Sequence, residues 1–162
     1  MQAAFIFAEP LHAANLDRPL NDKPTVRTEI VRGINTAFNC GSEFVSDVIQ
    51  QQHCMIKAVQ RDQETHPDYE PFQLGVFFGG CLQFDAEVNA AKSLEKTNRA
   101  AARNLPIFRK ARKAMFDALK SVQNELRISD TEMVEAGGDR GADASKTLAK
   151  LRSLEITHGN GD

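Results

Sequence analysis

Apolar residues recur at steps of three and four positions from Thr25 to about Gln63, and this spacing constrains the fold more than any other feature of the chain. The period places these residues on one face of an α-helix, whereas a half-buried strand requires apolar residues at every second position. The hydroxyl group of Thr25 or of Thr28 can cap the first turn, and Pro24 fits just before it. We therefore predict one long helix over residues 25–63.

Two glycines lie inside this first predicted helix. Gly33 and Gly41 each cost about 1 kcal/mol relative to alanine in a helix interior. A kink or a break near residues 39–41 is therefore the alternative to a continuous helix.

A second long helix is predicted from Pro71 to Arg103, because residues 66–71 contain two prolines and an aspartate that mark a turn. The first part of this helix is apolar on more than one face, which indicates burial. Gly75 and Gly79 lie one helical turn apart, a spacing that lets another helix backbone approach closely. The alternative is a glycine-rich break in the helix at this point.

The remaining elements are also predicted to be helical. Leu105-Pro106 should break the second helix, and an apolar stripe predicts a third helix over 107–126. Residues 129–132 have the capping-box pattern Ser-Asp-Thr-Glu, which predicts a short helix that ends at Gly137-Gly138. A last helix is expected over 143–153.

The predicted fold is therefore all-α, with three main helices in a bundle, two of them long. We divide the chain into an irregular N-terminal arm (1–24), the bundle (25–127), a short C-terminal helical pair (128–156) and a tail (157–162). At 162 residues the chain is long enough to bury a core, and its 41% hydrophobic content is typical of a globular protein.

The three cysteines are predicted to be reduced thiols. On one continuous helix, Cys40 and Cys54 would lie about 21 Å apart along the axis, too far for a disulfide. The N-terminus has no basic segment before its apolar residues, and the longest apolar stretch, 72–82, is too short to cross a bilayer. These features together predict a cytoplasmic protein.

Charge is distributed unevenly along the sequence. Lys92, Lys96, Arg99 and Arg103 lie at i, i+4, i+7 and i+11, which in a helix forms one stripe of positive charge. From Lys92 to Arg127 there are ten basic residues and three acids, a net charge of +7. Since the whole chain carries −2, the remainder carries −9. This asymmetry predicts a surface for an anionic partner or for an acidic surface of another copy.

We predict that this binding surface continues past Pro106. It comprises seven basic residues: Lys92, Lys96, Arg99, Arg103, Arg109, Arg112 and Lys113. The function we favour is a non-enzymatic adaptor, assembly or regulatory protein that binds an acidic macromolecular partner. The alternatives are a DNA-binding regulator that holds phosphates by charge, and a solvated helix face with no partner. The stripe contains no aromatic residue for base stacking, which disfavours single-stranded nucleic acid.

The C-terminal pair could extend a DNA-binding surface through Lys146, Lys150 and Arg152, because a capped helix, a glycine turn and a second helix resemble helix-turn-helix patterning. The connection from Gly137 to Asp143 is long for that motif, and two helices that cap a bundle explain the same residues.

No catalytic residue, metal ligand or cofactor is predicted, because the cysteines and histidines lack metal-ligand or nucleophile–base spacing. A small helical enzyme is the third hypothesis, and it would require a pocket with convergent polar groups. Long helices rich in phenylalanine often bury surplus apolar surface between subunits, so we also predict a homo-oligomer, most simply a dimer, with no membrane partner.

Overall fold

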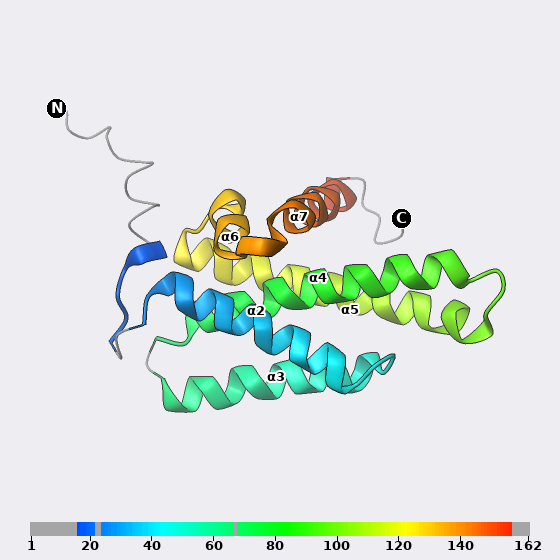
Figure 1. Cartoon of the computed structure of the whole chain (residues 1–162), viewed down its shortest axis with the longest axis horizontal. Helices are drawn as coiled ribbons and strands as arrows, with labels where there is room; N and C mark the ends of the chain where they lie inside the picture. Colours follow the sequence, from blue (N-terminus) through cyan, green and yellow to red (C-terminus); the bar gives the residue numbers. More distant parts are fainter. Residues whose placement is uncertain (1–15, 22–23, 67, 157–162) are drawn as a thin grey trace.

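The computed structural model describes residues 16–21, 24–66 and 68–156, and within these ranges the fold is all-α, as predicted (Figure 1). Its α-helices are α2 (Val26–Glu43), α3 (Val48–Thr65), α4 (Glu70–Leu94), α5 (Arg99–Leu126), α6 (Asp130–Ala136) and α7 (Gly141–Ile156). A short 3₁₀ helix, η2 (Gly138–Arg140), joins the last two. Four of these helices are substantial, where the sequence predicted three.

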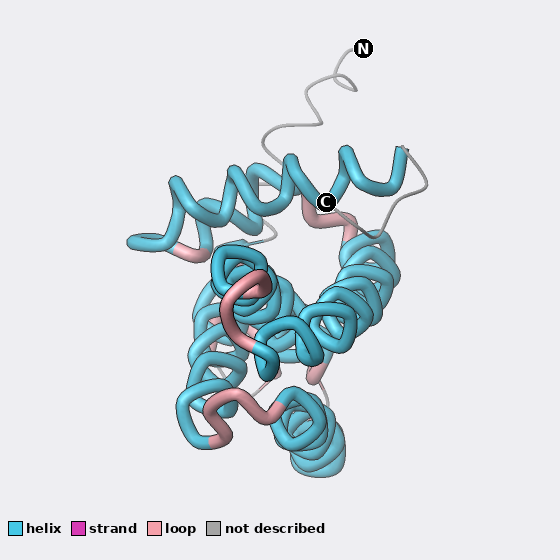
Figure 2. The backbone as a smooth tube through the Cα atoms, turned by 90° about the vertical axis from the view of Figure 1, so that its right-hand side faces the viewer, coloured by secondary structure: helices cyan, strands magenta, loops and turns pink. Residues whose placement is uncertain are grey.

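Helix α4 is the centre of the fold, because its contacts with α2 and with α5 are the most extensive in the molecule. Helices α2 and α3 form one hairpin, and α4 and α5 form a second, longer one (Figure 1). The α6–α7 segment covers one side of the α4–α5 hairpin. Figure 2 shows the uppermost helix, which is α7, running crosswise over the others.

The α2–α4 interface depends on glycines, as the Gly75–Gly79 spacing predicts. A Cβ atom on Gly75 would lie 2.1 Å from the carbonyl oxygen of Ile30, and one on Gly33 would lie 2.2 Å from that of Phe72. One turn further along, a Cβ on Gly79 would lie 2.9 Å from the Ile34 carbonyl oxygen. Gly75 thus faces Ile30, and Gly79, four residues later, faces Ile34. Because the numbers increase in both helices, α2 and α4 run parallel with their backbones in close contact.

The single helix predicted over residues 25–63 is wrong, because the chain turns between α2 and α3. Helix α2 ends at Glu43, Phe44 leaves the helical conformation, and Ser46 within the turn has a positive φ of 62°. Asp47 then caps α3 by accepting a hydrogen bond from a backbone amide. The buried Gln51 side chain donates to the carbonyl oxygen of Phe44 at 2.8 Å and so satisfies the end of α2.

This turn also overturns the prediction of three reduced thiols. It brings the Cα atoms of Cys40 and Cys54 to 5.7 Å, and the two residues form a disulfide between α2 and α3. The estimate of 21 Å assumed a continuous helix. Cys81 alone is a free thiol among the described residues, and burial raises its pKa far above the ordinary value, so it stays protonated and unreactive.

The break predicted at Leu105-Pro106 between the second and third helices is also in the wrong place. The chain turns at residues 95–98, where the Asn98 side chain accepts a hydrogen bond from the amide of Ala101 and caps α5. Pro106 lies inside α5 rather than ending a helix. Its side chain is exposed, so the Ala102 carbonyl oxygen that loses its partner can be satisfied by water.

The ends of the described chain pack onto the bundle. Leu16 and Leu20 are buried, and Pro19 forms an isolated bridge with Thr25, which caps α2 as predicted. The predictions for most of the arm and for the tail fall on 1–15, 22–23 and 157–162, outside the described residues.

At the C-terminal end, Ser129 forms the predicted capping box with Glu132. Arg152 of α7 donates to Asp130 at 2.9 Å and to the Gln123 side chain at 3.0 Å, so it links α7 to α5 and α6.

Candidate interaction surface

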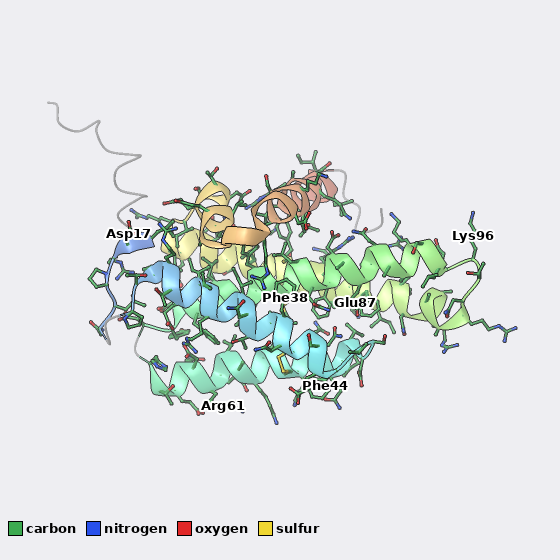
Figure 3. The ribbon with its side chains drawn as sticks, viewed as in Figure 1. Asp17, Phe38, Phe44, Arg61, Glu87 and Lys96 are labelled. Carbon is green, nitrogen blue, oxygen red and sulfur yellow. A yellow bond between two sulfur atoms is a disulfide. The ribbon has the colours of Figure 1, made fainter. Side chains whose placement is uncertain are left out.

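The α4–α5 hairpin extends beyond the rest of the molecule. Gly41, near the end of α2, lies beside Gln83 of α4. From Gln83 to Leu94, α4 rises by about 16 Å. Figure 1 shows this end of the hairpin reaching past α2 and α3, and Figure 3 shows Lys96 at its extremity. A surface at this position is open to a partner from several directions.

We call residues 92–110 the basic tip, because this range contains six basic residues and one acid, Glu95, for a net charge of +5. Four of the six are exposed: Lys96, Arg99, Arg103 and Lys110. None of these four forms an ion pair or a side-chain hydrogen bond with another described residue. Their charge is therefore available to a negatively charged partner.

The turn at residues 95–98, which connects α4 to α5, divides the predicted stripe of basic residues between the two helices of the hairpin. Lys92 lies on α4 and Lys96 in the turn, whereas Arg99 and Arg103 lie on α5. The steps from Arg99 to Arg103 and on to Ile107 place all three on one exposed face of α5. The charges thus remain together at one end of the molecule, although the single stripe does not form.

Arg112 does not belong to the exposed surface, contrary to the prediction. Its side chain is 2% exposed, and it donates to the buried carboxylate of Asp85 at 2.8 Å. Lys113 is exposed but pairs with Asp117 at 3.1 Å, and Arg109 is half-buried. The exposed unpaired charge therefore lies nearer the turn than the sequence indicated.

Apolar side chains lie among these charges. Leu94, at the end of α4, is 48% exposed, and Ile107 on α5 is 41% exposed. Leu94 is exposed although it follows the apolar period of the preceding helix, because it lies in the last turn of α4, where the hairpin projects. A surface that combines cations with accessible aliphatic side chains suits a protein partner better than a phosphate backbone.

The polar residues around Asp85 were missed by sequence reasoning. Lys150 of α7 lies 2.8 Å from the same Asp85 carboxylate oxygen that Arg112 contacts, and its ammonium group also donates to Asn89 at 3.2 Å. The available signal was an aspartate within an otherwise apolar stretch of α4. A buried carboxylate requires a cationic partner, but the sequence does not show which cations reach it.

A second polar cluster, in which an arginine pairs with two buried carboxylates, joins α2 to α3. Arg32 donates to Glu29 at 2.5 Å and to Asp62 at 2.6 Å, and its guanidinium lies 4.0 Å from the centre of the Phe72 ring. Burial alone would lower the pKa of Arg32, but its hydrogen bonds to the two carboxylates outweigh that effect and raise it. The cluster fixes α3 at the end opposite the disulfide, so we assign it a structural role.

Comparisons with protein-family models, with curated proteins and with solved structures found no match, so function has to be inferred from the chain's own chemistry. Across the described ranges, no group of three or more histidine, cysteine, aspartate or glutamate side chains could hold a metal ion. No helix in the same ranges has the length and apolar content needed to span a membrane.

Proposed function

We propose that this protein is a non-enzymatic adaptor, assembly or regulatory protein that binds an acidic macromolecular partner through the basic tip. One observation carries the proposal: Lys96, Arg99 and Arg103 are exposed cations without an ion pair among the described residues, and they lie in the turn and the first two turns of α5 at the projecting end of the hairpin, where Figure 3 shows Lys96. Binding an anion there costs little reorganisation, because no internal salt bridge has to break first.

The partner we favour is an acidic protein surface. Leu94 and Ile107 offer apolar area beside the cations, and such area stabilises a protein interface through burial. The alternative is a nucleic-acid-binding regulator. The one aromatic residue of the basic tip, Phe108, is buried, so the tip offers no ring on which an unpaired base could stack.

Binding to two labelled probes distinguishes these functions. We would measure fluorescence anisotropy with a 20-residue peptide of glutamate and leucine and with a 20-base-pair DNA duplex, each at 50 and 200 mM salt. We expect the peptide to bind more tightly than the duplex. Tighter binding of the duplex, with a steep loss at high salt, would support the nucleic-acid regulator instead.

A matched pair of variants tests whether the basic tip is responsible. Lys96→Glu/Arg99→Glu should weaken peptide binding at least tenfold. Lys57→Glu/Arg61→Glu makes the same change of charge on the exposed face of α3, where Figure 3 shows Arg61 directed away from the bundle. This control should bind like the wild type. If neither probe binds at low salt, or if both variants lose binding equally, the proposal is wrong.

Self-association is a further part of the proposal. Val45 and Ile49, at the α2–α3 turn and the start of α3, are 73% and 66% exposed, which is unusual for large aliphatic side chains. Contact with a second copy would cover them. Light scattering should therefore give a mass above the 17.9 kDa of one chain, and a monomer at micromolar concentration would contradict this expectation.

A further inference from the structure

A pocket of about 570 Å³ lies where α2, α4 and α7 meet, on the part of α4 that precedes the basic tip. Its volume is within the range of small-molecule sites in proteins. The residues that line it are Phe38, Leu82, Asp85, Ala86, Asn89, Arg140, Asp143, Lys146, Thr147 and Lys150.

One wall of the pocket is apolar and aromatic. Phe38 comes from α2, and Leu82 and Ala86 come from α4. The guanidinium of Arg140 lies 4.6 Å from the centre of the Phe38 ring. Together the ring and the guanidinium offer flat surfaces against which a planar group can pack.

The floor of the pocket is polar, and its carboxylate is paired with cations. The buried carboxylate of Asp85 receives Arg112 and Lys150, each at 2.8 Å, and Asn89 donates to its other oxygen at 3.4 Å. Two cations around one carboxylate leave the floor with an excess of positive charge. An anion above it therefore meets no uncompensated negative charge from Asp85.

The rim adds two cations that lack a carboxylate partner. Lys146 is exposed and forms no ion pair or side-chain hydrogen bond with another described residue. Arg140 contacts the Phe38 ring but has no ion pair in the same part of the chain. Asp143 is the one acidic residue among the described residues of the rim, so the described charged residues that line or underlie the pocket are four cations and two carboxylates.

We infer that this pocket binds a small organic anion that has a planar apolar part, with the ring against Phe38 and Leu82 and the phosphate or carboxylate group against Lys146 and Arg140. The inference does not depend on the proposed function of the basic tip. It concerns binding only.

Fluorescent naphthalene derivatives make suitable probes, because the chain has no tryptophan and one tyrosine and so adds little emission of its own. We would titrate the full chain with 1-naphthyl phosphate, 1-naphthoate, 1-naphthol and inorganic phosphate. We expect one saturable site per chain for a naphthyl anion, with affinity at least tenfold higher than for naphthol or for inorganic phosphate. The preference between phosphate and carboxylate identifies the anionic group.

Two variants locate the site. Lys146→Glu removes a rim cation and should weaken binding of the naphthyl anion at least tenfold. Ala86→Phe fills the pocket from an exposed position of α4, with Ala90→Phe one turn further along as the control that should bind normally. Circular dichroism would establish that each variant is folded.

Three results would overturn the inference. They are the lack of saturable binding up to millimolar probe, equal affinity for naphthol and the naphthyl anions, and binding that Lys146→Glu and Ala86→Phe both leave unchanged. The tip variant Lys96→Glu/Arg99→Glu should retain full affinity, so failure here and failure of the adaptor proposal are separate results.

Discussion

At the scale of single residues, glycine determines how closely the two central helices approach. The missing side chain at Gly75 lets a backbone carbonyl of α2 occupy the space where a Cβ would lie. Because the obstructing atom belongs to the backbone, no rotation of a side chain can relieve an added methyl group. The two helices would have to separate along the interface.

We therefore expect Gly75→Ala to destabilise the protein by about 3 kcal/mol, since the overpacking cost exceeds the gain of about 1 kcal/mol in helix propensity. Urea unfolding monitored by circular dichroism would measure the change. Gly41→Ala is the matched control, because its Cβ would meet only the end of the flexible Gln83 side chain. That variant should be neutral or slightly stabilised, and equal losses in both would refute the backbone contact.

Arginine and lysine illustrate what a sequence does not reveal about single residues. The spacing of Gly75 and Gly79 left a close helix contact and a break in the helix as alternatives, and the structure has the contact. Nothing local distinguished Arg112 from Lys96. Arg112 is buried because Asp85, 27 positions away, faces it across the hairpin, and that pairing depends on where the chain turns.

At the scale of elements, helix type was predictable and helix boundaries were not. The apolar period identified helical segments throughout, but Pro106 was given too much weight as a breaker and Asn98 too little as a cap. A proline on an exposed face loses one hydrogen bond to solvent-accessible backbone, and burial of the rest of α5 outweighs that loss. At residues 44–47 the cap Asp47 was likewise missed, and this hid the disulfide.

Pro106→Ala tests the continuity of α5 directly. Alanine restores a backbone donor and a favourable helix propensity, worth about 3 kcal/mol, against about 1 kcal/mol for the greater freedom of the unfolded chain. We expect a net stabilisation of about 2 kcal/mol in thermal unfolding. Pro71→Ala should give no gain, because Pro71 occupies the first turn of α4, where proline is well placed. If Pro106→Ala gives none either, α5 is broken at that point.

The Cys40–Cys54 disulfide should matter for the stability of the α2–α3 hairpin. It closes a loop across a separation of 14 residues, and the chain-entropy estimate for such a loop is about 3 kcal/mol. Reduction should therefore lower the free energy of unfolding by about this amount in urea titrations. The variant Cys40→Ser/Cys54→Ser should be destabilised and insensitive to reductant. A wild type that unfolds at the same urea concentration with and without reductant would contradict the prediction.

At the scale of the whole molecule, the uneven distribution of charge follows the arrangement of the helices. The positive charge lies at the far end of the α4–α5 hairpin, while the remainder of the chain is acidic overall. Helix α7 crosses the middle of the hairpin, where Lys150 and Arg152 fasten it by ion pairs to α4 and α6. The attachment of α7 therefore depends on carboxylates that acid can protonate.

The dependence of the α7 attachment on ionised carboxylates can be measured at Asp130. Hydrogen bonds from Arg152 lower the pKa of Asp130 below its ordinary value of 3.8, burial opposes the shift, and a hydrogen bond from Gln123 adds to it. A lowered pKa in the folded state means that ionised Asp130 stabilises the fold at all pH values above 3.8. This contribution disappears as the pH falls through the folded-state pKa, below 3.8.

Hydrogen exchange should then show the amides of α7 losing protection below pH 3.8 before those of α4, because α7 is attached through fewer buried contacts. Asp130→Asn should show weaker protection of α7 at neutral pH and a smaller change on acidification. Asp143→Asn removes an exposed carboxylate of α7 that has no ion pair among the described residues, and it should behave as the wild type. If α4 and α7 lose protection together in the wild type, α7 is an inseparable part of the core, and the ion pair of Asp130 with Arg152 does not control its attachment.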